Sequence, residues 1–73
     1  MDTVIKINTP YIKLDAFLKF AGIVETGGIA KRLIEDEFIR VNGEVCVQRG
    51  KKLYDGDVVT FDGVKYTLTG ADA

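Results

Sequence analysis

The first half of the chain repeats apolar residues at the spacing of an α-helix. Asn8–Thr9–Pro10 interrupts the chain before this repeat, and Gly22 offers a helix stop after it. The pattern predicts a helix that begins at Tyr11 or Ile12. Its apolar stripe consists of Leu14, Phe17, Leu18 and Ala21.

A second helical repeat follows after a short connection. Thr26 is a residue type that caps helix N-termini, whereas Gly27–Gly28 directly after it lowers helix propensity. The apolar stripe of this helix consists of Ile29, Ala30, Leu33 and Ile34. Because the connection is short, we expect the two helices to pack as an antiparallel or steeply crossed pair.

The rest of the chain follows the two-residue period of β-strands. Two hairpin turns are expected, at Asn42–Gly43 and Asp62–Gly63. Between them we expect a polar, basic loop from Gln48 to Lys52 and a turn from Leu53 to Gly56. The tail from Thr69 to Ala73 is expected to fray. The predicted strands are Thr3–Ile7, Phe38–Val41, Glu44–Val47, Asp57–Phe61 and Val64–Leu68. The pattern therefore predicts a single α+β domain over residues 1–73, with a helix pair packed on a small, mostly antiparallel sheet.

The composition argues against an enzyme. The chain has no histidine, which is the commonest general base and metal ligand, and we predict neither a cofactor nor a metal site. Cys46, the one cysteine, lies between two valines and is expected to be a buried apolar residue. Asp55 and Asp57 flank a glycine and are better explained by turn chemistry than by acid–base catalysis. A small domain without disulfides, with no apolar run long enough to cross a membrane, is typical of the cytosol.

The net charge of −1 disfavours binding to phosphates, but the ten cations are unevenly distributed. If the basic loop folds beside the helix pair, its cations and those of the helices would form one phosphate-binding surface, and Gly27–Gly28 at a helix N-terminus would let a phosphate approach closely. The candidate contacts are Lys13, Lys19, Thr26, Gly27, Gly28, Lys31, Arg32, Arg49, Lys51 and Lys52.

Each of these features also has a purely structural explanation. Lys19 can pair with Asp15, and Arg32 with Asp36, on the surface of its own helix. Gly27–Gly28 can serve only to let the two helices approach closely. The aromatic residues Tyr11, Phe20 and Tyr54 could stack on bases, but we expect at least two of them to pack in the core or at its rim.

The order of these motifs resembles the S4 domain, a family of RNA-binding modules. The resemblance runs from about Ile12 to Phe61 and rests on the spacing of Ala30, Leu33–Ile34 and Val41–Asn42–Gly43. The absence of a further domain makes the chain similar to the small stand-alone bacterial members. The resemblance implies binding of structured RNA, often ribosomal, by the two helices and the adjoining hairpin loop.

Single positions of the family carry over onto this chain. Lys31 matches a basic helix position, Thr26 a small hydroxyl residue at the helix start, and Asn42–Gly43 the hairpin turn. The chain departs from the family at two places: Gly27–Gly28 stands where many members have arginines, and Glu37 stands where many have glycine. The acidic run from Glu35 to Glu37 adds negative charge.

We therefore predict a cytosolic, monomeric and non-catalytic protein that binds structured RNA, ribosomal or tRNA-like, through the helix pair and the loop at residues 49–52. A protein–protein adaptor that keeps the fold but binds RNA weakly is the alternative, and the acidic balance of the chain favours it. The sequence does not specify which RNA is bound.

Overall fold

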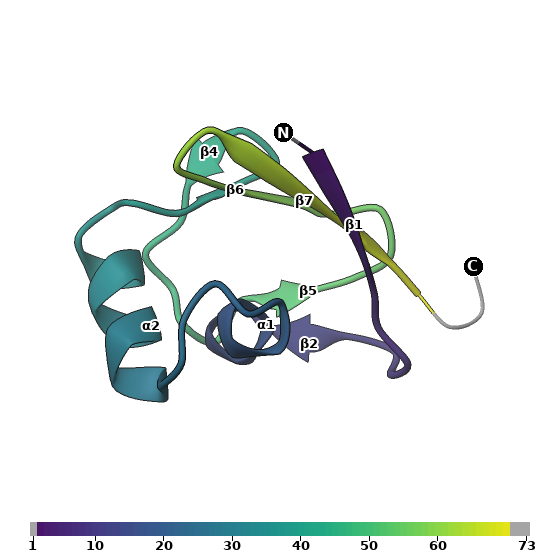
Figure 1. Ribbon diagram of the computed structural model, residues 1–73, viewed down its shortest axis with the longest axis horizontal. Coiled ribbons are helices and arrows are strands. Elements are labelled where there is room, and N and C mark those ends of the chain that lie inside the picture. The colour runs from purple at the N-terminus through teal and green to yellow at the C-terminus, as the bar shows by residue number, and fades with distance from the viewer. Residues whose placement is uncertain (1, 71–73) are drawn as a thin grey trace.

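The computed structural model describes residues 2–70. A five-stranded sheet forms one side of the molecule, and both helices lie on the other side together with a two-stranded sheet (Figure 1). The elements are β1 (Asp2–Lys6), β2 (Ile12–Lys13), α1 (Leu14–Phe20), α2 (Gly27–Glu35), β3 (Arg40–Val41), β4 (Glu44–Val45), β5 (Lys52–Leu53), β6 (Val58–Phe61) and β7 (Val64–Thr69). This architecture confirms the predicted α+β fold.

The larger sheet has the strand order β1-β7-β6-β3-β4. Its neighbouring strands are antiparallel except for the first and last along the chain, β1 and β7, which pair in parallel with Val4 opposite Thr67. The turn at Asn42–Gly43 joins β3 to β4 with φ angles of 52° and 88°. Positive φ at both positions is the geometry of a tight hairpin, so this predicted turn is confirmed.

The hydrophobic core fills the space between the two layers. Phe17 and Leu18 of α1 and Ile34 of α2 belong to the predicted helical stripes and are fully buried. Ile29, predicted in the stripe of the second helix, is instead 47% exposed. The core consists of Ile7, Leu14, Phe17, Leu18, Val24, Ala30, Ile34, Ile39, Val41, Leu53, Val59 and Leu68. Cys46 is only partly buried and packs against this core.

Both helices end in the same hydrogen-bonded turn. The N–H of Ile23 donates to Leu18 and that of Gly22 to Lys19 after α1, while Phe38 donates to Leu33 and Glu37 to Ile34 after α2. This is a Schellman motif, whose penultimate residue needs a positive φ. Gly22 has a φ of 76°, which confirms the predicted stop. Glu37 has a φ of 66° in the equivalent place, which favours glycine.

The predicted start of the first helix is wrong. Ile12 and Lys13 form strand β2, which pairs with β5, and the helix begins only at Leu14. Ile12 lies opposite Leu53, which is fully buried, so packing of these two apolar side chains fixes the strand pair. The same pairing corrects the predicted loop at residues 49–52, because Lys52 belongs to β5.

Other boundaries also differ. Strand β1 lies one residue earlier and β6 begins one residue later than predicted, and Leu53, predicted to begin a turn, ends β5. Strands β3 and β4 are each two residues long instead of four, although the N–H of Cys46 still donates to the carbonyl of Ile39 beyond their ends. Thr69, predicted to fray, is the last residue of β7, and its carbonyl accepts the N–H of Ile7 at 2.8 Å. Gly70, also predicted to fray, donates its N–H to the carboxylate of Asp55 at 2.7 Å, and residues 71–73 lie outside the described residues.

Candidate nucleic-acid interface

A shallow hollow of about 240 Å³ separates α1 from the beginning of α2. It is lined by Asp15, Ala16 and Lys19 of α1 and by Gly27 of α2. The predicted neighbours Asp15 and Lys19 thus both face the first turn of the second helix. Lys19 and the exposed helix start favour an anion in this hollow, whereas the carboxylate of Asp15 disfavours one.

The two glycines at the start of α2 are not there to let the helices approach. A Cβ built on Gly27 would meet no atom within 4 Å, and one on Gly28 would meet only Thr26 Oγ1 at 3.9 Å. Neither glycine has a positive φ. The explanation by close helix packing is therefore wrong, and the glycines instead leave the backbone of this turn open to solvent.

The remaining polar residues of α2 divide between its two ends. Thr26 is the N-cap as predicted, because its hydroxyl accepts the N–H of Ile29 at 3.2 Å. Lys31 follows Gly27 by about one helical turn and so lies on the same side of α2, whereas Arg32 is turned about 140° from Gly27 around the helix. The acidic run begins at Glu35, about 12 Å from the helix start.

The basic segment before β5 is attached to the start of α1. The N–H of Leu14 donates to the carbonyl of Lys51 at 2.9 Å, and the N–H of Asp15 donates to that of Arg49 at 3.2 Å. These bonds satisfy two of the N–H groups that a helix leaves unpaired at its N-terminus. The loop therefore does lie beside the helix pair, which was the condition for a common phosphate-binding surface.

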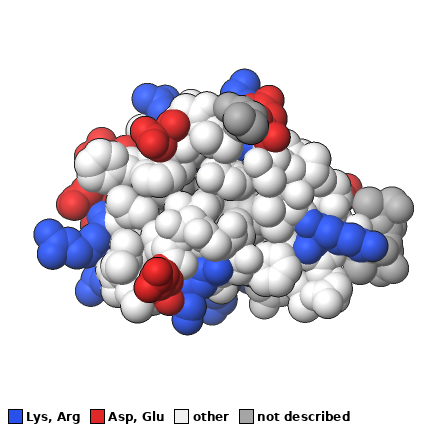
Figure 2. All heavy atoms as spheres, viewed as in Figure 1, with Lys and Arg blue, Asp and Glu red and all other residues white. Residues whose placement is uncertain are grey.

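The predicted contacts fall into two groups. Lys13, Arg49, Lys51 and Lys52 belong to the segments joined at the start of α1. Lys19 and Gly27 line the hollow between the helices, and Thr26, Gly28 and Lys31 are near Gly27 at the start of α2. Arg32 joins neither group. The face seen in Figure 2 is mostly uncharged, with basic side chains near its outline and acidic side chains between them. The cations thus form local clusters instead of one broad basic face on this side.

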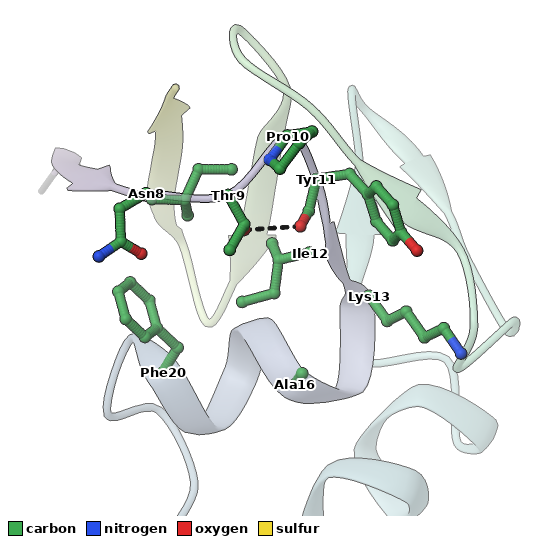
Figure 3. A pocket seen from close by; sticks show the side chains of 9 residues that line it. Asn8, Thr9, Pro10, Tyr11, Ile12, Lys13, Ala16 and Phe20 are labelled. Carbon is green, nitrogen blue, oxygen red and sulfur yellow. Dashed lines mark hydrogen bonds between the residues drawn. The ribbon is translucent and has the colours of Figure 1, made fainter. Parts of the chain in front are cut away.

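The three aromatic residues that could stack on bases lie at the surface. Tyr11, Phe20 and Tyr54 are 38%, 54% and 50% exposed, so none belongs to the core, and the rings of Tyr11 and Tyr54 contact each other at the rim with centroids 6.0 Å apart. Phe20 and Tyr11 both border an apolar pocket of about 520 Å³, together with Ile12 and Ala16 (Figure 3). The alternation of Tyr11, Ile12 and Lys13 was a possible signal, but it is too short to identify a strand.

Two aspartates predicted to serve in turns do bind the backbone. The carboxylate of Asp57 accepts the N–H of Tyr54 at 2.8 Å and the side-chain amide of Asn42 at 3.1 Å. The carboxylate of Asp55 accepts the N–H of Gly70 at 2.7 Å. Both groups therefore have structural partners.

Residues 2–70 bring together no group of three or more histidine, cysteine, aspartate or glutamate side chains that could hold a metal ion. No helix in this part of the chain is both long and apolar enough to span a bilayer.

Comparison with known proteins agrees with this geometry. The family model of the S4 domain matches residues 5–69, which include both helices and all the strands from β2 to β7. A probable ribosome maturation protein of Bacillus subtilis (strain 168), RlbA, is 44% identical over 59 residues, which cover 81% of this chain and 83% of that protein. The chain therefore belongs to the S4 domain family.

Proposed function

We propose that this protein binds structured RNA, ribosomal RNA in the first place, without catalysing a reaction on it. The family and the similarity to a probable ribosome maturation protein support a role with ribosomal RNA in the cytosol. The observation that carries the proposal is the attachment of Arg49 and Lys51 to the start of α1 by backbone hydrogen bonds. This attachment gathers cations from distant parts of the sequence around one helix start.

Binding by shape suits such a small surface. The deep, narrow major groove of A-form RNA hides the base edges, so proteins recognise duplex RNA largely through its backbone and shape. In this proposal the hollow between α1 and α2 holds a phosphate near Lys19 and Gly27, and the cluster around Lys51 contacts a second one. A net charge of −1 is compatible with this arrangement. At physiological salt the interaction between surface charges is screened beyond about 8 Å, so the local cluster of cations matters more for a bound phosphate than the net charge of the chain.

Removing one cation from each group tests the proposal directly. We expect the double variant Lys31→Gln, Lys51→Gln to bind ribosomal RNA more weakly than the native protein, because two phosphate contacts are lost. The slope of log affinity against log salt concentration should become shallower by about 1.8. Filter binding or fluorescence anisotropy over a salt series measures both quantities.

The matched control removes two lysines from the five-stranded sheet. Lys6 and Lys65 are exposed on β1 and β7, so the variant Lys6→Gln, Lys65→Gln has the same net charge as the test variant. We expect its salt slope to stay close to that of the native protein. Equal losses in both double variants would show that only net charge matters, and no loss in the test variant would refute the site.

The glycines provide a second test that separates stability from binding. Replacing Gly27 and Gly28 with alanine should raise the free energy of unfolding by about 0.4–1 kcal/mol each, because both positions are open and have ordinary helical φ. The added methyl groups should weaken RNA binding if a phosphate contacts this turn. Thermal denaturation and anisotropy measure the two effects, and a stabilised variant with undiminished RNA affinity would remove the glycines from the site.

One observation favours the adaptor function as a second candidate. Phe38, Val45 and Val47 are 41–59% exposed, and the pairing of Arg40 with Val45 places all three on the outer face of the β3–β4 hairpin. Exposed apolar groups on one face are typical of protein contacts. If the native protein fails to bind RNA at low salt but retains a protein partner after nuclease treatment, the adaptor function replaces RNA binding.

A further inference from the structure

The outer face of the two-stranded sheet carries two tyrosines and two lysines. Ile12 and Leu53 lie opposite each other and point toward the core, so their neighbours in sequence point outward. Lys13 lies opposite Lys52, and continuing the same register places Tyr11 opposite Tyr54. Figure 3 shows Tyr11 and Lys13 extending on the same side of the chain. We name these four residues the tyrosine–lysine face.

The aromatic part of this face is ordered but open. The ring centroids of Tyr11 and Tyr54 are 6.0 Å apart with an angle of 47° between the planes, and Lys52 Nζ lies 4.9 Å from the centroid of Tyr11. The N–H of Tyr54 donates to Asp57, which fixes the backbone under the second ring. Although these contacts hold the rings in place, about half of Tyr54 remains exposed, so a planar group can stack on it.

Apart from the contact of Lys52 with the Tyr11 ring, the two lysines of the face repel each other. Like charges directly opposite each other on two strands destabilise a sheet, yet Lys13 and Lys52 form such a pair. The backbone bonds to the start of α1 bring Arg49 and Lys51 next to the same strands. An anion bound here would relieve the repulsion among these cations.

We infer that the tyrosine–lysine face binds an unpaired nucleotide of the RNA, with its base stacked on the tyrosines and its phosphates at Lys13 and Lys52. Aromatic groups with adjacent cations are the combination that single-stranded nucleic acids require, since every base has a stacking surface. A base within a duplex is covered on both faces by its neighbours. The inference rests on the proposed function and adds a site specific for unpaired RNA, separate from the hollow between the helices.

The experiment compares two RNA probes and two tyrosine variants of the full chain. The probes are an octamer of uridine and a duplex of 16 base pairs, and the variants are Tyr11→Leu, Tyr54→Leu and the conservative Tyr11→Phe, Tyr54→Phe. We expect the leucine variant to bind the octamer at least about tenfold more weakly, while the phenylalanine variant stays close to the native protein, because phenylalanine keeps the stacking surface. Affinity for the duplex should change by less than about twofold.

Tyrosine fluorescence gives an independent readout. The chain has three tyrosines and no tryptophan, so its emission comes from Tyr11, Tyr54 and the partly buried Tyr66. Stacked bases should quench the emission when the octamer binds, but much less when the duplex binds. The variant Phe20→Leu, which removes another exposed aromatic residue, is the matched control and should bind the octamer normally.

The outcomes separate this inference from the proposed function. If the native protein binds both probes and the leucine variant binds the octamer equally well, the tyrosine–lysine face is refuted while RNA binding stands. If the leucine variant loses affinity for both probes to the same extent, the face is not selective for unpaired nucleotides and the inference is also refuted. If the native protein binds neither probe nor ribosomal RNA at low salt, both proposals are wrong.

Discussion

Replacing Phe17 with alanine is expected to lower the free energy of unfolding by about 3–5 kcal/mol. The side chain of Phe17 is fully buried and is among the largest in the core between the helices and the sheet. Its loss removes apolar contact area and leaves a cavity that neighbouring side chains fill only in part. A domain of 73 residues has a total stability of about 4–11 kcal/mol, so this variant should lose a large part of its stability.

Urea denaturation followed by circular dichroism measures this loss. Phe20 provides the control on the same helix, because it is 54% exposed and Phe20→Ala should cost less than about 1 kcal/mol. Similar midpoints for the two variants would contradict the placement of α1 against the sheet. The comparison also matters for binding experiments, since loss of RNA affinity in an unfolded variant says nothing about the interface.

Replacing Asn42 with alanine is expected to cost about 2–3 kcal/mol, the second largest effect. Asn42 has a φ of 52°, and its side chain connects the β3–β4 turn to β6: the carbonyl oxygen accepts the N–H of Val58 at 2.9 Å, and the amide donates to Asp57 at 3.1 Å. Alanine disfavours the positive φ and can make neither bond. The same measurement by urea denaturation reports the change.

The variant Asn42→Gly separates the two causes. Glycine adopts a positive φ readily, so the stability lost in Asn42→Gly should reflect only the missing hydrogen bonds. This loss should be about 1–2 kcal/mol smaller than the loss in the alanine variant. Equal losses for glycine and alanine would show that backbone strain contributes nothing at this turn. The network matters beyond the turn, because Asp57 also accepts the N–H of Tyr54, and a less ordered Tyr54 should weaken stacking on the tyrosine–lysine face.

The fold relates stability and the proposed binding in a simple way. The helices and the short β2–β5 sheet use their inner sides for the core, and this leaves polar and aromatic side chains on the outer sides free to contact RNA. The start of α1 is the centre of this arrangement. It is stabilised by carbonyl groups of the basic segment, so the bonds that complete the helix also place Arg49 and Lys51 beside it.

The departures from the family pattern have different structural meanings. Glu37 occupies a backbone position with positive φ, where the glycine common in the family avoids strain, so this departure affects stability first. Gly27 and Gly28 occupy open positions where an added Cβ would meet no clash. Their presence therefore reduces the number of cations at the hollow, and it exposes backbone N–H groups in their place.

Local patterns in the sequence determined the elements that have enough length or strong turn signals. The helical spacing of Leu14, Phe17 and Leu18 identifies α1 because these side chains share one face, and Thr26 marks the start of α2 because its hydroxyl can cap the helix. Asn42–Gly43 specifies a hairpin because both residues accept positive φ. These features, together with the order of the motifs, were sufficient for the fold class and the family.

Only the tertiary structure decided which distant segments meet. Strands β2 and β5 are two residues long and carry no readable period, so their pairing depends on burying Ile12 and Leu53 against the core. That register places Tyr11 beside Tyr54 and Lys13 beside Lys52, although about 40 residues separate each pair in the sequence. The parallel pairing of β1 with β7 and the open space around Gly27 are likewise properties of the packed chain, because both depend on residues that no local pattern relates.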